Sequence, residues 1–478
     1  MAGSPLGLWD RTFYTVFSLM DTSTTITDTI AAISTPPGRG GIGIVRLSGP
    51  ESASIAVQLV RLRHPLEHAR ARFADVLDSE DSGVDAGRID EALVTWFAAP
   101  HSYTAEDLVE IAAHGSPVVL ELLLRRALDF GARLAEPGEF TQRAFLSGRL
   151  DLTQAEAVRD LIDAQTLTQA RVAASQMGGA LSRRVGPVKQ SLVELIARLE
   201  AGIDFAEDDV DVTPQTDIAR FIGELTPPLA ALEASFARGR VVHDGLTLAI
   251  VGRPNAGKSS LFNCLVERER AIVTATPGTT RDTVSERISL DGIPLELVDT
   301  AGLREGREEA EQLGIARSRE ALADAALVLV VLDATQPLNE EEHRLLAAIE
   351  GRPALVAVNK SDLAATEPLA LQIAGIPALP TSALTGEGIP ALRERILALA
   401  TGGASAEPGM LTSLRHQKAV ATALEALADA AQANTNAIPH EMILLDLYRA
   451  LWALDSLTGQ TTSDDILNLI FSTFCIGK

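Results

Sequence analysis

The sequence predicts a multidomain protein in which an α/β domain with a mainly parallel sheet is inserted into an all-α helical domain, after an α+β domain. The hydrophobic period becomes helical near residue 150 and changes to short apolar strand runs near residue 246. A Gly/Ala/Ser-rich linker then precedes a second helical stretch. The expected parts are a leader that we expect to be disordered (1–26), the α+β domain (27–145), the first helical part (146–244), the α/β domain (245–400) and the second helical part (401–478).

The length and the net charge of the chain limit the functions that it can have. The 478 residues suit about two to four domains, and 46% of them are hydrophobic. With 41 Lys and Arg against 64 Asp and Glu, the formal net charge is -23, so the chain alone should repel a phosphate backbone. The two cysteines are too few for a disulfide framework or a zinc site, and they suit a reducing cytoplasm. No apolar run is long enough to predict a membrane helix, and no secretory signal is expected.

The α+β domain is predicted from strand-like runs at residues 42–47 and 92–97 and a helical stretch at residues 117–130. In the helical parts, apolar residues recur every three or four positions and share one helix face. A break or kink is expected at Gly186-Pro187, because proline removes a helix hydrogen bond. The apolar stripes are Leu181, Val185, Val188, Leu192, Leu195 and Leu199, and later Val420, Leu424, Leu427, Leu447, Leu451 and Leu454.

The inserted domain shows apolar strand runs at residues 246–251, 295–298, 327–332 and 354–358, separated by helical segments. This alternation favours a parallel sheet with helices on both faces. The segment GRPNAGKSS, residues 252–260, directly follows the first run and precedes a helix. Such a loop wraps phosphates with backbone N–H groups, with its lysine at the outer phosphates and its serine hydroxyl on Mg²⁺. The predicted contacts are Asn255, Ala256, Gly257, Lys258, Ser259 and Ser260.

The segment NKSD, residues 359–362, predicts which base the bound nucleotide carries. It follows the strand run at 354–358. A carboxylate at Asp362 accepts from the two adjacent N–H groups that guanine presents, and an adenine base would leave it unpaired. Asn359 and Lys360 belong to the same motif. A second segment, Ser382, Ala383 and Leu384, would complete the base pocket through its backbone. The sequence therefore predicts GTP as the substrate.

Two further segments complete a GTPase pattern. Asp299, Thr300, Ala301 and Gly302 end the run at 295–298, where Asp299 suits the Mg²⁺ shell and the Gly302 N–H the γ-phosphate. Between this segment and the phosphate loop, Thr280 is placed to complete the metal site. Leu303 stands where Ras-type switches carry the glutamine that orients water, so catalysis must come from another group.

Two questions stay open at the level of the residues. The glutamates within residues 305–311 are candidates for catalysis, and a solvated helix face is the competing interpretation. Asn255 could hold a monovalent cation in place of an arginine finger, or it could simply stabilise the loop. No arginine can be assigned as a finger.

The flanking segments resemble one known family. TPPGRGGIGIVRLSG (35–49), SYTAEDLVE (102–110), EPGEFTQRAFLSGRLDLTQAEAV (136–158) and FCIGK (474–478) are similar to the MnmE (TrmE) family of tRNA modification GTPases. The resemblance covers about residues 27–478. It implies a homodimer whose N-terminal domain binds folate and dimerises, with a discontinuous helical domain and an inserted G domain.

The resemblance also implies an activity. The family works with an FAD-dependent subunit, MnmG (GidA), in a heterotetramer that places a carboxymethylaminomethyl or aminomethyl group on C5 of the wobble uridine of certain tRNAs. A tetrahydrofolate derivative, in 5-formyl or methylene form, supplies the one-carbon unit. K⁺-dependent dimerisation of the G domains activates hydrolysis.

Residue roles follow from the resemblance by motif. Glu311 matches the catalytic glutamate, Ser259 and Thr280 the Mg²⁺ ligands, and Arg46, Glu110, Arg149 and Lys478 the folate-binding positions. Arg149 stands where some members carry Lys. Cys475 matches a terminal cysteine with a proposed catalytic or site-shaping role, and a small buried apolar residue is the alternative. Cys264 is expected in the core. The K⁺ loop comprises Asn255 with Thr274, Ala275, Thr276, Pro277, Gly278 and Thr279, and it departs from the family's usual Asp-Ile-Ala at residues 275–277.

Two rival functions and an RNA-binding role for one basic segment fit the sequence less well. A regulatory GTPase switch in ribosome assembly would usually carry a basic RNA-binding module after the G domain, whereas residues 401–478 are acidic to neutral and helical. A folate-binding methyltransfer protein with a vestigial G domain is disfavoured because every nucleotide motif is intact. The basic run at residues 61–72 lacks aromatic residues for stacking on RNA, and a solvated helix face is the preferred interpretation.

Overall fold

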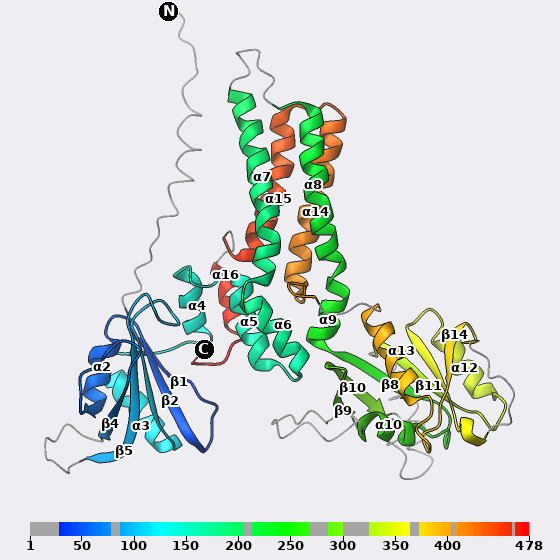
Figure 1. Cartoon of the computed structure of the whole chain (residues 1–478), viewed down its shortest axis with the longest axis horizontal. Helices are drawn as coiled ribbons and strands as arrows, with labels where there is room; N and C mark the ends of the chain where they lie inside the picture. Colours follow the sequence, from blue (N-terminus) through cyan, green and yellow to red (C-terminus); the bar gives the residue numbers. More distant parts are fainter. Residues whose placement is uncertain are drawn as a thin grey trace, which may run out of the picture. The chain divides into compact units, whose positions relative to one another are not determined.

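The computed structural model describes residues 28–77, 87–204, 213–267, 285–299, 325–363, 372–402, 407–460 and 464–477. The chain divides into two compact units, and each is described by itself (Figure 1). The first unit comprises Met1–Leu150 with Asp464–Lys478, and the second comprises Asp151–Ser463. None of the helices within the described ranges combines the length and the apolar content that a bilayer crossing requires.

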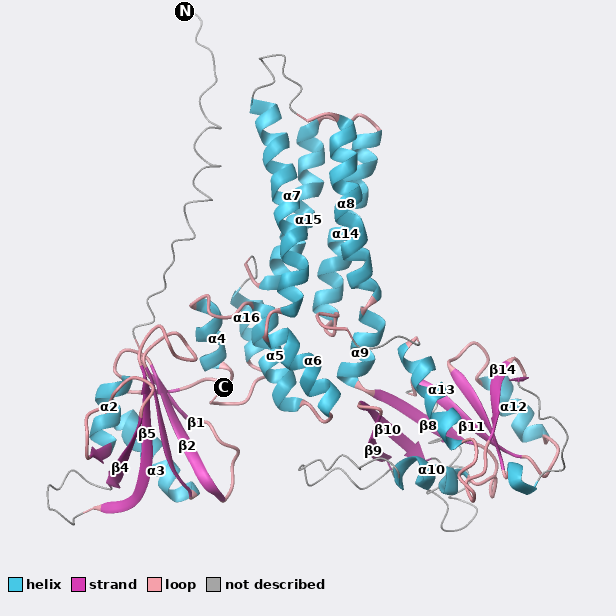
Figure 2. Ribbon diagram, in the orientation of Figure 1, coloured by secondary structure: helices cyan, strands magenta, loops and turns pink. Residues whose placement is uncertain are grey.

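In the first unit, the described residues form a mixed sheet, part of which is seen at β1, β2, β4 and β5 in Figure 2. Its seven strands follow the order β3-β4-β5-β6-β2-β1-β7. Helices α2 (Ser52–Leu59) and α3 (Pro117–Asp129) pack on one face, where Ile55 and Leu123 meet Val45 and Ile111 in the core. This confirms the predicted α+β class. The strands are β1 (Ile30–Ile33), β2 (Gly40–Ser48), β3 (Val60–Leu62), β4 (Ala71–Leu77), β5 (Arg88–Phe97), β6 (Leu108–Gly115) and β7 (Arg133–Leu134).

The basic run at residues 61–72 does not form the expected helix. It lies between and within β3 and β4, which pair antiparallel with Val60 opposite Val76 and Leu62 opposite Ala74. Val60 and Leu62 are two residues apart and pack toward the core, which is the period of a strand. Pro65 also disfavours a helix interior. The expectation of a helix face was therefore wrong.

Two further elements complete the first unit. Helix α4 (Glu139–Leu146) follows the sheet in sequence, and α16 (Asp464–Phe471) comes from the chain end. The rings of Phe471 and Phe474 lie 5.4 Å apart between centroids. Gly138 has left-handed backbone (φ 70°), and a Cβ there would lie 2.7 Å from the Phe471 carbonyl oxygen, so only glycine fits this approach. The end of the chain thus packs on the N-terminal sheet unit.

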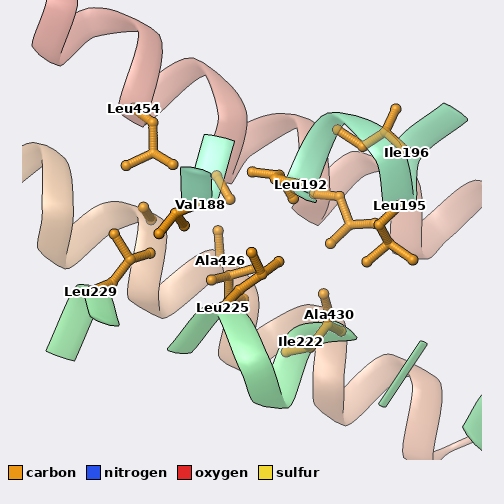
Figure 3. Close-up of a cluster of buried hydrophobic side chains, with 14 of the residues drawn as sticks. Val188, Leu192, Leu195, Ile196, Ile222, Leu225, Leu229, Ala426, Ala430 and Leu454 are labelled. Carbon is orange, nitrogen blue, oxygen red and sulfur yellow. The ribbon is translucent and has the colours of Figure 1, made fainter. Parts of the chain in front are cut away.

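In the second unit, long helices build a bundle. α7 (Ala180–Asp204) and α8 (Gln215–Ala234) from the first helical part pack with α14 (Leu414–Thr435) and α15 (His440–Thr458) from the second. Figure 3 shows Leu192, Leu225, Leu229, Ala426 and Leu454 converging in their core. The unit also holds α5 (Leu152–Asp163), α6 (Leu167–Met177) and α9 (Phe236–Asp244).

Helix α7 continues through Pro187 and does not break there. A proline inside a helix costs about 3 kcal/mol. Leu181, Val185 and Leu192 on the same helix are at most 1% exposed, and each buried side chain of this size contributes roughly 1.5–3 kcal/mol. Core packing on both sides of Pro187 therefore outweighs the lost hydrogen bond. The expected break was wrong, and the alternative, a kink at Pro187, stays a prediction.

The α/β part of the second unit confirms the expected parallel sheet. The described strands follow the order β13-β14-β12-β11-β8-β10-β9, and the pairs from β14 to β10 are parallel. α10 (Lys258–Glu267) and α13 (Ile389–Thr401) contribute side chains to the core on one face, and α12 (Glu340–Ala348) to the core on the other. The strands are β8 (Leu246–Val251), β9 (Ser285–Leu290), β10 (Ile293–Asp299), β11 (Leu327–Asp333), β12 (Ala354–Asn359), β13 (Gln372–Ile373) and β14 (Ile376–Pro380).

Candidate functional sites

The predicted nucleotide motifs lie at one edge of the parallel sheet. The phosphate loop follows β8, the Asn359–Asp362 motif follows β12, and Ser382 to Leu384 follow β14. Because β8, β11, β12 and β14 run parallel, their carboxyl ends meet at the same edge, where ligands of α/β sheets bind. The topology therefore brings the three motifs together.

The phosphate loop has a backbone that only its glycines allow. Gly252 has φ 148°, and a Cβ on it would lie 2.2 Å from the Val331 carbonyl oxygen. Gly257 has φ 93°, and a Cβ there would lie 2.0 Å from Asn359 Nδ2. Lys258 begins α10, is 8% exposed, and donates from Nζ to the carbonyl oxygens of Gly252 (2.9 Å) and Arg253 (2.8 Å). The loop is folded back on itself at a helix N-terminus, which is the geometry that binds anions.

Asn359 joins the three motifs with one side chain. Its Nδ2 donates to the Ala256 carbonyl oxygen (2.9 Å), and its Oδ1 accepts from the Ala383 N–H (3.0 Å). The residue is 2% exposed, so both hydrogen bonds are sheltered from water. Asp362 and Leu384 are exposed, whereas Ser382 is buried. The buried Asn359 amide thus connects the segments of the pocket, and the Asp362 carboxylate, which would bind the base, is exposed to solvent.

Several predicted site residues lie outside the described residues. These are Glu311, Thr274, Ala275, Thr276, Pro277, Gly278, Thr279, Thr280, Thr300, Ala301, Gly302 and Lys478, together with the side chain of Asp299. The backbone of Asp299 ends β10 opposite Ile250 of β8, at the same sheet edge as the phosphate loop. The roles predicted for these residues stay predictions.

Sequence reasoning missed an acidic cluster behind the phosphate loop. Arg253 Nη2 lies 3.7 Å from Asp333 Oδ2, and Arg253 Nε lies 3.4 Å from Glu342 Oε1. Burial raises the pKa of the Asp333 carboxyl, but hydrogen bonds from Lys360 and Thr335 outweigh it and lower this pKa to about 2. The signal in the sequence was an aspartate at the end of an apolar strand run, as at Asp299. The guanidinium of the phosphate loop is thus engaged with buried carboxylates.

The first unit holds a second candidate site, a cavity of about 510 Å³. Glu110 of β6 accepts two hydrogen bonds from Arg46 of β2, from Nε at 3.0 Å and Nη2 at 2.6 Å. The two residues are register partners on neighbouring strands. Arg149 Nη1 donates to the Tyr103 carbonyl oxygen (2.9 Å). The lining residues are Phe97, Pro100, His101, Ser102, Tyr103, Leu108, Glu110 and Arg149.

Tyr103 is a member of this cavity that the sequence did not single out. The guanidinium carbons of Arg149 and Arg46 lie 5.1 and 5.7 Å from the centre of its ring. Burial raises the pKa of the Tyr103 hydroxyl, which pairs with the Thr141 hydroxyl over 2.9 Å. A cation (Arg149), a carboxylate (Glu110) and an aromatic ring thus line one cavity, and Arg46 contacts both the carboxylate and the ring. This set suits a planar polar ligand with an anionic tail.

The chain terminus reaches the same cluster. Arg46 Nη1 donates to the Gly477 carbonyl oxygen (3.3 Å), and Ile476 forms an antiparallel bridge with Pro137. Cys475 is exposed, which does not support the buried role weighed for it. Cys264, by contrast, packs against the core of the α/β part and donates from Sγ to the Ala383 carbonyl oxygen (3.1 Å).

The phosphate loop after β8, the Asn359–Asp362 motif after β12 and the parallel sheet that aligns them define a P-loop protein of the guanine-nucleotide-binding class. Two family models match the chain, the MnmE helical domain over residues 152–475 and the GTP-binding protein TrmE N-terminus over residues 29–149. The chain belongs to the MnmE family of tRNA modification GTPases.

Individual relatives agree with the family models. The chain is 58% identical over 456 residues to the tRNA modification GTPase MnmE of Koribacter versatilis, covering 94% of this chain and 99% of that protein. It is 40% identical over 450 residues to the protein of the same name from Aquifex aeolicus, with the same coverage. Among solved structures, the G domain of the T. maritima FeoB iron transporter is 31% identical to this chain, with a TM-score of 0.26. The match covers 32% of this chain and 98% of that one.

Proposed function

We propose that the chain is a K⁺-activated GTPase that acts in the cytoplasm as a homodimer with the FAD-dependent subunit MnmG (GidA) in a heterotetramer. Its product is a carboxymethylaminomethyl or aminomethyl group at C5 of the wobble uridine of certain tRNAs, with a tetrahydrofolate derivative in 5-formyl or methylene form as one-carbon donor. The observation that carries the GTPase part is the buried Asn359 amide, which ties the phosphate loop to the base segment. The relatives that cover 94% of this chain support the tRNA part.

Guanine selection follows from the exposed Asp362 carboxylate. Two adjacent N–H groups of guanine match its two oxygens, and an adenine base would leave a desolvated carboxylate unpaired. Lys258 and the N-terminus of α10 would hold the phosphates, because both present donors at the loop. Binding energy in this site thus comes from fixed donors that need little rearrangement.

Described residues of the loop fit the two cations. Ser259 is exposed in the first turn of α10, and Asn255 is exposed with left-handed backbone (φ 62°). Hydroxyl and amide oxygens are hard ligands that suit Mg²⁺ and K⁺. In the proposal, Ser259 and Thr280 would hold Mg²⁺, and Asn255 with Thr274, Thr276 and Thr279 would hold K⁺. Both cations would supply positive charge at the phosphates. Glu311 orients the attacking water.

The cavity of the first unit fits the folate derivative. The Glu110 side chain is 27% exposed and so retains accepting capacity beside its pair with Arg46. A carboxylate suits the adjacent N–H donors of a pterin, and the guanidiniums of Arg46 and Arg149 suit an anionic glutamate tail. Tyr103 offers a ring face at the same place. In the proposal these residues, with Lys478, bind and orient the folate derivative.

The net negative charge of the chain limits how much of the tRNA backbone this chain can contact by itself. A formal net charge of -23 opposes a large phosphate footprint, so in this proposal the partner subunit supplies much of the RNA contact. No described feature favours the rival function, a regulatory switch in ribosome assembly: in α14 and α15 the acidic side chains outnumber the arginines and lysines.

The test is steady-state GTP hydrolysis in matched KCl and NaCl, with Mg²⁺ present and ionic strength fixed. We expect a large stimulation specific to K⁺, because the cation takes the place of an arginine finger. The variant Glu311→Ala should retain GTP binding and lose most hydrolysis. Equal slow rates in both salts would contradict K⁺ activation by this chain alone, and wild-type turnover by Glu311→Ala would contradict the role of Glu311.

A further inference from the structure

A buried carboxylate lies beside the guanine motif, and the nucleotide motifs do not include it. Asp333 is the last residue of β11 and the register partner of Asn359, the last residue of β12. The Ala334 N–H donates to the Asn359 carbonyl oxygen (2.8 Å), so the two strand ends stay paired past Asp333. The Asp333 side chain is 4% exposed. Strand register alone therefore places an acid next to the residue that follows Asn359.

Three hydrogen bonds and one longer ion pair reach this carboxylate. Oδ2 accepts from Lys360 Nζ (2.7 Å) and lies 3.7 Å from Arg253 Nη2. Oδ1 accepts from the Thr335 N–H (2.9 Å) and from the Thr335 hydroxyl (2.6 Å). A charge this deeply buried is tolerated only when it is paired and hydrogen-bonded. Here the two pairing cations come from two different nucleotide motifs, the guanine motif and the phosphate loop.

The backbone conformation of Lys360 needs support from contacts such as the one with Asp333. Its φ is 64°, in the left-handed region that a lysine rarely adopts and that persists only where surrounding contacts hold it. The side chain is 33% exposed although its ammonium ends on a buried acid. A lysine stem held in this way presents methylene groups at the site, and such a stem offers an apolar surface to a planar ring.

The phosphate loop is tied to the same cluster through Glu342, which is 2% exposed. One carboxylate oxygen of Glu342, Oε2, accepts from the Asn339 N–H and caps α12 (3.0 Å), and the other, Oε1, lies 3.4 Å from Arg253 Nε. The Arg253 guanidinium therefore lies within ion-pair distance of both Glu342 and Asp333.

We propose that Asp333 is a positioning residue for guanine recognition: it holds Lys360 so that the lysine stem lies ready to pack on the base, and its charge attracts Arg253 of the phosphate loop. The inference rests on the proposed binding of GTP. Asp333 acts through Lys360 and does not touch the nucleotide.

The test uses the full chain and the variant Asp333→Asn, which keeps the shape and the acceptor for Thr335 but removes the charge. We expect the affinity for a fluorescent GDP analogue to fall about tenfold and KM for GTP to rise by a similar factor, with kcat changed by less than about twofold. Asp333→Glu should recover part of the affinity. The control is Glu340→Gln, because Glu340 pairs with Arg344 on the exposed side of α12, where the side chains are 90% and 80% exposed.

A double-mutant cycle with Lys360→Ala separates positioning from a structural role. If Asp333 acts through Lys360, then Asp333→Asn causes little further loss of affinity once Lys360→Ala is present. Fully additive losses would overturn the inference, as would unchanged affinity in Asp333→Asn.

Failure of the wild-type chain to bind the analogue would instead contradict the proposed function. Where Asp333→Asn does not fold, Lys360→Met keeps the stem, removes the ammonium and should weaken binding similarly; wild-type affinity in that variant would also overturn the inference.

Discussion

The nucleotide site and the cavity of the first unit are built by different means. Around the phosphate loop, the main determinants are backbone: glycines with no room for a Cβ, a helix N-terminus and carbonyl groups that hold Lys258. At the cavity, strand register brings Glu110 of β6 beside Arg46 of β2, and the segment after α4 adds Arg149. A site built from backbone groups is encoded by consecutive residues. A site built from side chains of distant segments forms only when the whole domain has folded.

The largest effect should come from adding a Cβ to the phosphate loop. Gly257→Ala would place that atom 2.0 Å from Asn359 Nδ2 at a φ of 93°, so both the overlap and the backbone strain oppose the loop. We expect nucleotide affinity to fall by more than about a hundredfold, which is roughly 3 kcal/mol. The measurement is titration with a fluorescent GDP analogue.

The matched control is Gly351→Ala, at a glycine that also has positive φ (77°) but no atom within 4 Å of its Cβ position. This change should lower stability by about 1 kcal/mol and leave nucleotide affinity intact. Equal losses of affinity in both variants would show that strain anywhere in the domain matters, and that the contact with Asn359 does not.

A smaller loss of nucleotide affinity is expected from Asp362→Asn, which changes a side chain of the nucleotide site. The amide presents a donor where the carboxylate accepted, so guanine nucleotides should lose about 2 kcal/mol of binding relative to xanthine nucleotides. Competition between GTP and xanthosine triphosphate measures the ratio. An unchanged preference would contradict the assignment of base reading to Asp362.

Removing the charge of Glu110 should weaken ligand binding at the cavity of the first unit. Glu110→Gln leaves Arg46 without its carboxylate partner, and we expect the affinity for 5-formyltetrahydrofolate to fall about tenfold while nucleotide affinity stays the same. Calorimetric titration of both ligands checks this. Glu67→Gln serves as control, since Glu67 pairs with Arg70 and Arg72 at the surface of the same unit. A comparable loss in the control would remove Glu110 from the site.

The smallest effect concerns pH and an ion pair in the helical part. Hydrogen bonds to Asp160 and Asp244 raise the pKa of His243 to about 9, despite burial that opposes the charge. Protonated His243 therefore stabilises the fold fully below its ordinary pKa of 6.5, and this contribution is lost as pH rises through 9. We expect His243→Gln to lower Tm by about 2–4 °C at pH 6 and to have little effect near pH 10. A loss of Tm that is the same at both pH values would rule out the ion pair as its source.

The parts of the fold that were predictable are those with local periods. The Leu181 to Leu199 stripe fixed one face of α7, and the apolar runs at residues 246–251 and 327–332 became β8 and β11. Local rules failed where packing outweighed them. Pro187 lies inside α7 because buried side chains on both sides keep the helix together, and the basic run at residues 61–72 became strand and turn because Val60 and Leu62 face a core.

The sequence by itself determined the nucleotide class of this protein, because Gly252 to Ser259 and Asn359 to Asp362 encode their function in consecutive residues and their local backbone. Only the tertiary structure decided that Asp333 holds Lys360, that Tyr103 joins the cavity, and that Arg46 meets both Glu110 and Gly477. Arg46 lies 64 positions from Glu110 and 431 from Gly477 in the chain. Contacts over such separations depend on strand register and on where the chain end packs, and no local pattern of residues specifies either.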